Sequence, residues 1–146
     1  MEYFKNSDHP IWEEVVNSIL EFKPDWVGYT SYTANISAID IISKKLREAA
    51  PDIKQVVGGT HATLDNSLLG KLKYLDYSVS REGEYVMLDL VNGKDPKSIV
   101  GCASRDRDGF ITHNGDAEVL DCDLLPFPER DKFWKLTPEQ RLTVDV

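Results

Sequence analysis

The chain has 146 residues, enough for one domain with a buried core, and its 29% of charged residues is ordinary for a globular protein. Its net charge of −8 comes without any cluster of Lys and Arg that outweighs the acids, which argues against nucleic-acid binding. No apolar run approaches the roughly 20 residues that span a bilayer, and the polar first ten residues are unlike a secretory signal. We therefore expect a cytoplasmic protein, with Cys102 and Cys122 both reduced.

The first half of the chain alternates between helical and extended patterns. Apolar residues at helical spacing predict a helix over 10–22, with Ser7 or Asp8 as its N-terminal cap. The bunched apolar run 26–31 predicts a strand that is buried on both faces. A second amphipathic helix follows over 34–50.

The same alternation continues along the chain. Segment 53–58 predicts a strand that runs into a glycine pair, and a short helix follows over 66–73. Segment 76–80 predicts a third strand and segment 84–92 another amphipathic helix. The sequence therefore predicts an α/β domain in which three parallel strands are neighbours in chain order, joined by right-handed crossovers.

The last part of the chain has a different pattern. Segments 98–104 and 110–113 flank an Asp-Gly turn within 105–109, which predicts a β-hairpin. The run Leu-Leu-Pro-Phe-Pro at 124–128 is incompatible with a regular helix or a central strand. We expect it to be extended, either docking on the domain or leading to a neighbour.

Polar and glycine-rich segments follow each of the three predicted parallel strands. In open parallel sheets, ligands bind beyond the carboxyl ends of the strands. The segments at this edge are Thr30-Ser31-Tyr32-Thr33, Gly58-Gly59-Thr60-His61 and Arg81-Glu82-Gly83-Glu84.

Each of these segments also has a purely structural interpretation. The glycine pair 58–59 lets backbone approach a ligand, or forms a tight turn. The hydroxyls of Ser31 and Thr33 bind a polar group or cap the next helix. Segment 82–84 holds a cation or begins a helix, and His61 is a ligand or a surface residue. No phosphate-loop, dinucleotide or nucleophile-elbow motif is present, so the sequence predicts no catalytic residue and no metal site.

Four segments carry motifs in a characteristic order. They are KPDWVGYTS at 23–31, VVGGTHAT at 56–63, DYSVSREGE at 76–84, and, after Gly109, DLLPFPERD at 123–131. Together they resemble the cobalamin (vitamin B12)-binding domain of the cobalamin-dependent radical S-adenosylmethionine (SAM) enzymes. Two features depart from that family: Arg81 stands where a glycine is usual, and the DxHxxG motif that supplies a lower axial ligand to cobalt is absent.

The resemblance implies a Rossmann-like or flavodoxin-like parallel sheet that is incomplete at its N-terminus, because a strand–helix–strand unit before residue 10 is missing. It implies that 1–97 is the cobalamin-binding α/β part, that 98–131 is the hairpin and linker, and that 132–146 begins the connection to a missing radical SAM domain. The CxxxCxxC motif of that domain is absent from the sequence.

The resemblance also implies the cofactor and its contacts. Cobalamin would bind here, its tail running along the carboxyl edge of the sheet, whereas SAM and an iron–sulfur cluster would belong to the missing domain. This chain alone would not be catalytic, and the parent enzyme would be a methyltransferase or would modify a tetrapyrrole or other metabolite. The implied cofactor-binding residues are Thr30, Ser31, Tyr32, Thr33, Gly58, Gly59, Thr60, His61, Glu82, Gly83 and Glu84.

Two other functions remain open at this point: a flavodoxin-like module that binds a flavin, and a non-catalytic structural or interaction domain. For the cobalamin site we expect Gly59→Val to weaken cofactor binding more than folding. In the implied strand order, Trp26–Tyr29 forms an apolar edge without Pro or Lys. This predicts a homodimer through that edge, unless the segment before residue 10 or the tail 124–128 covers it.

Overall fold

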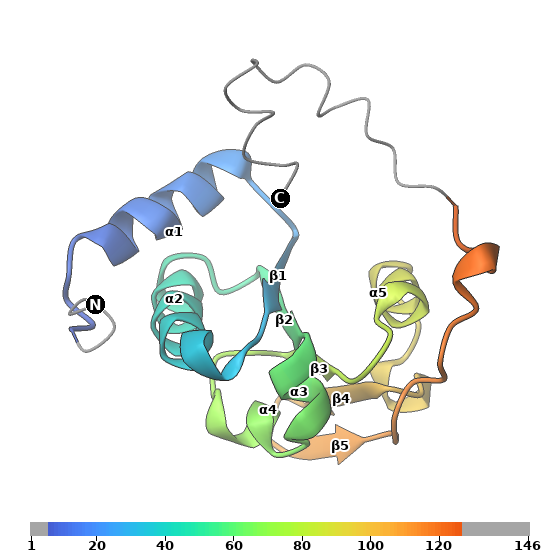
Figure 1. Cartoon of the computed structure of the whole chain (residues 1–146). Coiled ribbons are helices and arrows are strands. Elements are labelled where there is room, and N and C mark those ends of the chain that lie inside the picture. Colours follow the sequence, from blue (N-terminus) through green and yellow to red (C-terminus); the bar gives the residue numbers. More distant parts are fainter. Residues whose placement is uncertain (1–5, 127–146) are drawn as a thin grey trace.

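A five-stranded mixed sheet forms the centre of the computed structural model, which describes residues 6–126 (Figure 1). The strands lie in chain order: β1 (Trp26–Thr30), β2 (Lys54–Gly58), β3 (Tyr77–Val79), β4 (Cys102–Arg105) and β5 (Ile111–His113). The first three pair in parallel, which confirms the predicted set of neighbouring strands. The last two add antiparallel, so the predicted hairpin is confirmed and extends the same sheet.

Five helices flank the sheet: α1 (Ile11–Phe22), α2 (Ile36–Ala49), α3 (Thr60–Leu64), α4 (Leu68–Lys71) and α5 (Glu84–Val91). Helices α1 and α2 lie on one side of the sheet and α5 lies on the other (Figure 1). The α/β class predicted from the sequence is therefore correct. None of the helices in the described part of the chain is long and apolar enough to cross a membrane.

Strand β2, which lies between β1 and β3, shows how the two faces of the sheet acquire their cores. Consecutive strand residues point to opposite faces. Val57 packs with Ile39 and Leu69 on the side of α2, whereas Val56 packs with Val86 on the side of α5. Because both faces are covered, the apolar residues of this strand are bunched rather than alternating.

The helix boundaries differ from the prediction in three places. Helix α3 was not predicted, and α4 is shorter than the predicted segment 66–73. The predicted cap of α1 is wrong: Pro10 occupies the cap position without a side-chain hydrogen bond. The Ser7 hydroxyl instead donates to Asp8, and the Ile11 amide donates to Nδ1 of His9.

The hairpin is shorter than predicted at its start. The first predicted strand began at residue 98, but 96–98 forms a 3-10 turn capped by Asp95, and β4 begins only at Cys102. Arg105 belongs to this strand rather than to the turn. Residues 122–124 form another 3-10 turn, so the predicted extended segment 124–128 begins later than expected. Its last two residues, and the ranges 127–131 and 132–146, lie outside the described residues.

Candidate functional site

A groove lined by glycines lies where the three parallel strands end, on the α5 side of the sheet. Its volume is about 320 Å³. Four glycines line it: Gly28 in β1, Gly58 and Gly59 at the end of β2, and Gly83 before α5. It is therefore at the edge where the sequence predicts a ligand.

The groove is open because its floor has no side chains. A Cβ atom placed on Gly58 would meet nothing closer than the carbonyl oxygen of Val79 at 3.8 Å, and one on Gly28 nothing closer than Cγ1 of Val56 at 4.0 Å. The fold therefore has room for side chains at both positions, yet such side chains would occupy the groove. These glycines make a space that a ligand can use.

At Gly59 the backbone conformation, rather than space for a ligand, requires a glycine. Its φ is +92°, a left-handed conformation that side chains disfavour, and a Cβ would lie 2.9 Å from the backbone nitrogen of Ser31. A valine here would clash with backbone before it met any ligand. The geometry therefore does not support the expectation that Gly59→Val weakens cofactor binding more than folding. Gly58→Val suits that comparison better, because a Cβ at Gly58 makes no close contact.

Ser31 joins the ends of two strands to the start of α3. Its side chain is fully buried, and its hydroxyl donates to the Gly58 carbonyl (2.7 Å) and accepts from the Ala62 amide (3.1 Å). Its carbonyl accepts from the His61 amide (3.0 Å). The hydroxyl therefore shapes the glycine turn and caps α3, a different helix from the one that the sequence suggested.

His61 and Thr33 bind each other beside this turn. The distance between Nδ1 of His61 and Oγ1 of Thr33 is 3.0 Å, and Nε2 of His61 lies 3.8 Å from Oδ2 of Asp65. Hydrogen bonds from Lys71 and Ser67 lower the pKa of Asp65 to about 2, so the carboxylate stays charged. Nδ1 of His61 thus has a hydrogen-bond partner within the chain, whereas Nε2 faces a carboxylate beyond hydrogen-bonding distance.

A family model for the B12 binding domain matches residues 3–91. The chain belongs to the B12 binding domain family. Because the match spans the three parallel strands and every glycine that lines the groove, it includes the whole candidate site.

Two curated proteins are similar to this B12 binding domain. Over 84 residues it is 37% identical to the anaerobic magnesium-protoporphyrin IX monomethyl ester cyclase of Rubrivivax gelatinosus, covering 57% of this chain and 15% of that protein. Over 125 residues it is 24% identical to an uncharacterized methyltransferase of Pyrococcus horikoshii, covering 82% of this chain and 27% of that protein. The chain thus spans about a quarter or less of either relative.

Two solved structures share the fold at low sequence identity. One is the radical S-adenosylmethionine methyltransferase TsrM from Kitasatospora setae, with cobalamin and a 4Fe-4S cluster bound (TM-score 0.59, 18% identity, 82% of this chain and 23% of that one). The other is the apo form of the cobalamin-dependent S-adenosylmethionine radical enzyme OxsB (TM-score 0.62, 19% identity, 84% of this chain and 18% of that one).

Within this B12 binding domain, the groove contains four of the eleven residues predicted from the sequence. Thr30, Gly58, Gly59 and Gly83 line it. The remaining seven are not among the residues that line it: Ser31, Tyr32, Thr33, Thr60, His61, Glu82 and Glu84. Among these, Glu84 begins α5, which bears out the structural interpretation of segment 82–84. No group of three or more potential metal-ligating side chains occurs within residues 6–126.

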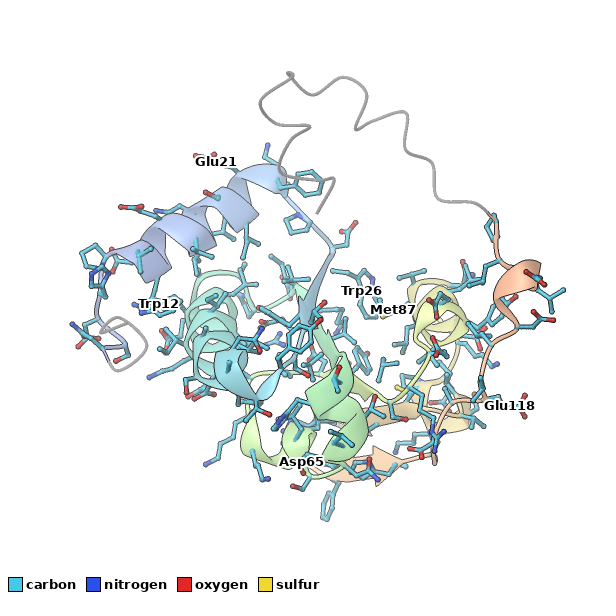
Figure 2. All side chains as sticks on the ribbon, in the orientation of Figure 1. Trp12, Glu21, Trp26, Asp65, Met87 and Glu118 are labelled. Carbon is cyan, nitrogen blue, oxygen red and sulfur yellow. The ribbon has the colours of Figure 1, made fainter. Side chains whose placement is uncertain are left out.

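Sequence reasoning missed the walls of the groove. Val56 lies two residues before Gly58 on β2, Val79 ends the neighbouring strand β3, and Met87 lies one helical turn after Gly83. Figure 2 shows Met87 projecting from α5 toward the sheet near Trp26, and both pack on the same apolar cluster. Strand periodicity from Gly58 would have identified Val56.

Arg81 also lines the groove, at the position where the family usually has glycine. Its φ is +59°, the left-handed region in which a glycine costs least. Its amide donates to Oγ1 of Thr63 (2.8 Å), and its Nε donates to Asp116 (3.1 Å). These bonds hold the arginine in that conformation and place the one charged side chain of the groove lining at its rim.

Proposed function

We propose that this chain binds cobalamin at the carboxyl ends of β1, β2 and β3, with the nucleotide tail of the cofactor in the glycine-lined groove. The groove itself carries the proposal, because Gly28 and Gly58 leave space that the fold does not need. Membership of the B12 binding domain family supports it. A volume of about 320 Å³ also lies within the range of small-molecule sites.

The chemistry of the lining suits a mostly apolar ligand that carries one negative charge. Val56, Val79 and Met87 form apolar walls, and Arg81 stands at the rim. Nε of this guanidinium donates to Asp116, and the terminal nitrogens, which have no hydrogen bond within residues 6–126, can bind the phosphodiester of the cobalamin tail. Backbone amides at the glycine turn are positioned by Ser31 rather than by the ligand.

In this proposal the chain binds and orients cobalamin. Cobalamin, when bound, supplies a cobalt centre that carries methyl groups or electrons. We propose further that a radical SAM domain with SAM and an iron–sulfur cluster acts beside it, in a methyltransferase or an enzyme that modifies a tetrapyrrole or another metabolite. The relatives named above, a cyclase and two methyltransferases, support this class of reaction. We propose that the protein is cytoplasmic, as expected from the sequence.

A binding titration with a steric block tests the cobalamin site. We expect the purified chain to retain cobalamin on gel filtration with its visible absorption bands, and Gly58→Val to weaken binding at least tenfold by filling the groove. Gly70→Val is the matched control, because Gly70 lies in α4 outside the groove and a Cβ there meets only Cδ1 of Ile111, at 3.7 Å.

The same titration separates the alternatives. Flavin mononucleotide has different absorption bands, so a chain that binds flavin and not cobalamin would show the flavodoxin-like function instead. A chain that binds neither would favour the structural or interaction domain. Equal cobalamin affinity in the wild type and in Gly58→Val would exclude the groove as the site.

A further inference from the structure

A second, much smaller pocket lies on the other face of the sheet, beside the end of β3. Its volume is about 40 Å³, and polar side chains of Asn66, Ser78, Ser80 and His113 line it. Successive residues at the end of β3 and in the turn after it line this pocket and the glycine-lined groove alternately. Ser78 and Ser80 line the pocket, whereas Val79 and Arg81 line the groove.

Ser80 is the residue that gives this pocket its chemistry. It is only 8% exposed, and its hydroxyl has no hydrogen-bond partner in the described part of the chain. Buried hydroxyls are nearly always bonded, because water has been removed from them and nothing else compensates. The backbone around it is fixed, since the Ser80 amide donates to the Gly101 carbonyl (3.0 Å). Something outside residues 6–126 is therefore expected to bond this hydroxyl.

The rest of the lining indicates what that group is. Among residues 6–126, no Lys, Arg, Asp or Glu lines the pocket, so a charged group would enter without a counter-charge from this part of the chain. Hydroxyls, an amide and an imidazole donate and accept hydrogen bonds, so the best complement also does both. One water molecule needs roughly 10–15 Å³ of such space, so a volume of about 40 Å³ has room for a group of a few non-hydrogen atoms. These properties fit a primary carboxamide.

We propose that this pocket binds one of the peripheral carboxamides of the corrin ring, with Ser80 as its hydrogen-bond partner. This inference rests on the proposed function, since it takes cobalamin to be the ligand at this edge. The position supports it, because Ser80 directly follows β3 and precedes Arg81 at the rim of the glycine groove. A ring seated over the strand ends can then reach both spaces at once.

Cobalamin derivatives in which a single peripheral carboxamide is hydrolysed to a carboxylate test the pocket. We expect one isomer of this series to bind the wild-type chain at least tenfold more weakly than cobalamin, because its carboxylate would enter a pocket without a cation. Ser80→Ala should weaken cobalamin about fivefold to tenfold, the loss of one hydrogen bond. Ser80→Ala should leave the affinity for that one isomer unchanged, because the carboxylate of that isomer has already lost the hydrogen bond to Ser80.

Two controls distinguish binding from folding. Ser80→Ala removes an unbonded hydroxyl, so its melting temperature without ligand should equal or exceed that of the wild type. Ser37→Ala, at an exposed site in α2, should bind every derivative as the wild type does. A lower melting temperature for Ser80→Ala would assign the hydroxyl a structural role and overturn the proposal.

The outcomes for this pocket and for the proposed function are separable. If the wild type binds no cobalamin, both are wrong. If the wild type binds cobalamin but Ser80→Ala binds cobalamin and every isomer equally well, the pocket holds only water and the cobalamin site stands without it.

Discussion

Two grooves meet at β1, and Gly28 lines both of them. One is the glycine-lined groove at the carboxyl ends of the strands. The other lies between α1 and β1 and has a volume of about 670 Å³, roughly twice as large as the first at about 320 Å³. We refer to it as the α1–β1 groove. Figure 1 shows α1 against α2, standing off from the rest of the sheet.

The two grooves are lined by different kinds of groups. The glycine-lined groove has a floor of backbone, held by hydrogen bonds that Ser31 makes to both neighbouring turns. The α1–β1 groove is lined by apolar side chains of α1, Ile11, Val15 and Phe22 among them, and Glu14 is the one charged residue of its lining. Phe22 is 84% exposed.

This difference bears on what each groove can bind. A small cofactor needs fixed polar groups and close approach to backbone, which the smaller groove provides. An exposed apolar stripe beside an unpaired strand edge is typical of a protein interface. Volume alone would favour the α1–β1 groove as the ligand site, whereas we propose the smaller groove.

Gly59→Val should give the largest effect. A Cβ at this position would lie 2.9 Å from the Ser31 nitrogen, and φ is +92°. We expect a loss of about 3 kcal/mol in the free energy of unfolding, measured by urea denaturation, with cobalamin binding lost in proportion to the unfolded fraction. Gly58→Val should lose less than about 1 kcal/mol, because its nearest contacts are ordinary. Equal stability of the two variants would contradict the stated role of Gly59.

Ser31→Ala should have the next largest effect. The Ala62 amide would lose its buried acceptor, whereas the Gly58 carbonyl would keep the Ser31 amide as donor. Leaving one buried group unbonded costs about 1–3 kcal/mol. The free energy of unfolding should therefore fall by this amount. The exposed Ser37→Ala should change it by less than about 0.5 kcal/mol. If Ser31→Ala were as stable as the wild type, the glycine turn would not depend on this hydroxyl.

Only some features of the fold and of the glycine-lined groove could be predicted from the sequence. Apolar runs and helix periodicity placed the three parallel strands, because burial on both faces leaves a plain signal. The positions of Gly58 and Ser31 at a strand end follow from the same pattern. Their separate roles do not, because the hydrogen bonds of Ser31 depend on α3, a five-residue helix with no periodic pattern of its own.

Side chains assigned from motifs were less well placed than those assigned from strand periodicity. Tyr32 is 56% exposed, although it belongs to one of the predicted segments. Arg81 lines the groove, although the sequence placed it only in a polar segment at this edge and not among the implied cofactor-binding residues. Its left-handed backbone depends on bonds to Thr63 and Asp116, residues 18 and 35 positions away. Contacts between residues so far apart follow from the packed fold rather than from any local pattern.

Self-association through β1 remains a prediction, and the structure identifies the groups that would carry it. The amide of Lys54 donates to Asp25, and the amide of Ser31 donates to Gly58, so odd-numbered residues of this region pair with β2. The amides of Trp26 and Gly28 therefore face the open edge. Gly28 is the middle residue of β1, so two copies can pair antiparallel about it with two-fold symmetry.

A charge on the exposed face of α1 tests this edge without disturbing the core. We expect the wild type to gain mass with concentration in light scattering and Phe22→Glu to weaken that association about tenfold, or about 1.4 kcal/mol. Phe110→Glu is the control, because Phe110 is similarly exposed (74%) but lies after β4, at the opposite end of the sheet. A wild-type mass that stays monomeric at high micromolar concentration would show that a second copy does not occupy the α1–β1 groove.

His61→Ala should produce the smallest effect, although histidine is the residue type most often considered as a ligand of cobalt. Its Nδ1 lies 3.0 Å from the Thr33 hydroxyl, and its Nε2 faces Asp65. Coordination through Nδ1 would break the hydrogen bond to Thr33, and coordination through Nε2 would require the ring to turn away from Asp65. We therefore expect the absorption and electron paramagnetic resonance spectra of bound cobalamin to be the same in the variant and in the wild type. The affinity should change by less than about threefold, which is below the contribution of one ordinary hydrogen bond. Loss of a nitrogen hyperfine pattern from the cobalt(II) spectrum of the variant would instead assign His61 as an axial ligand, with the Thr33 contact broken on binding.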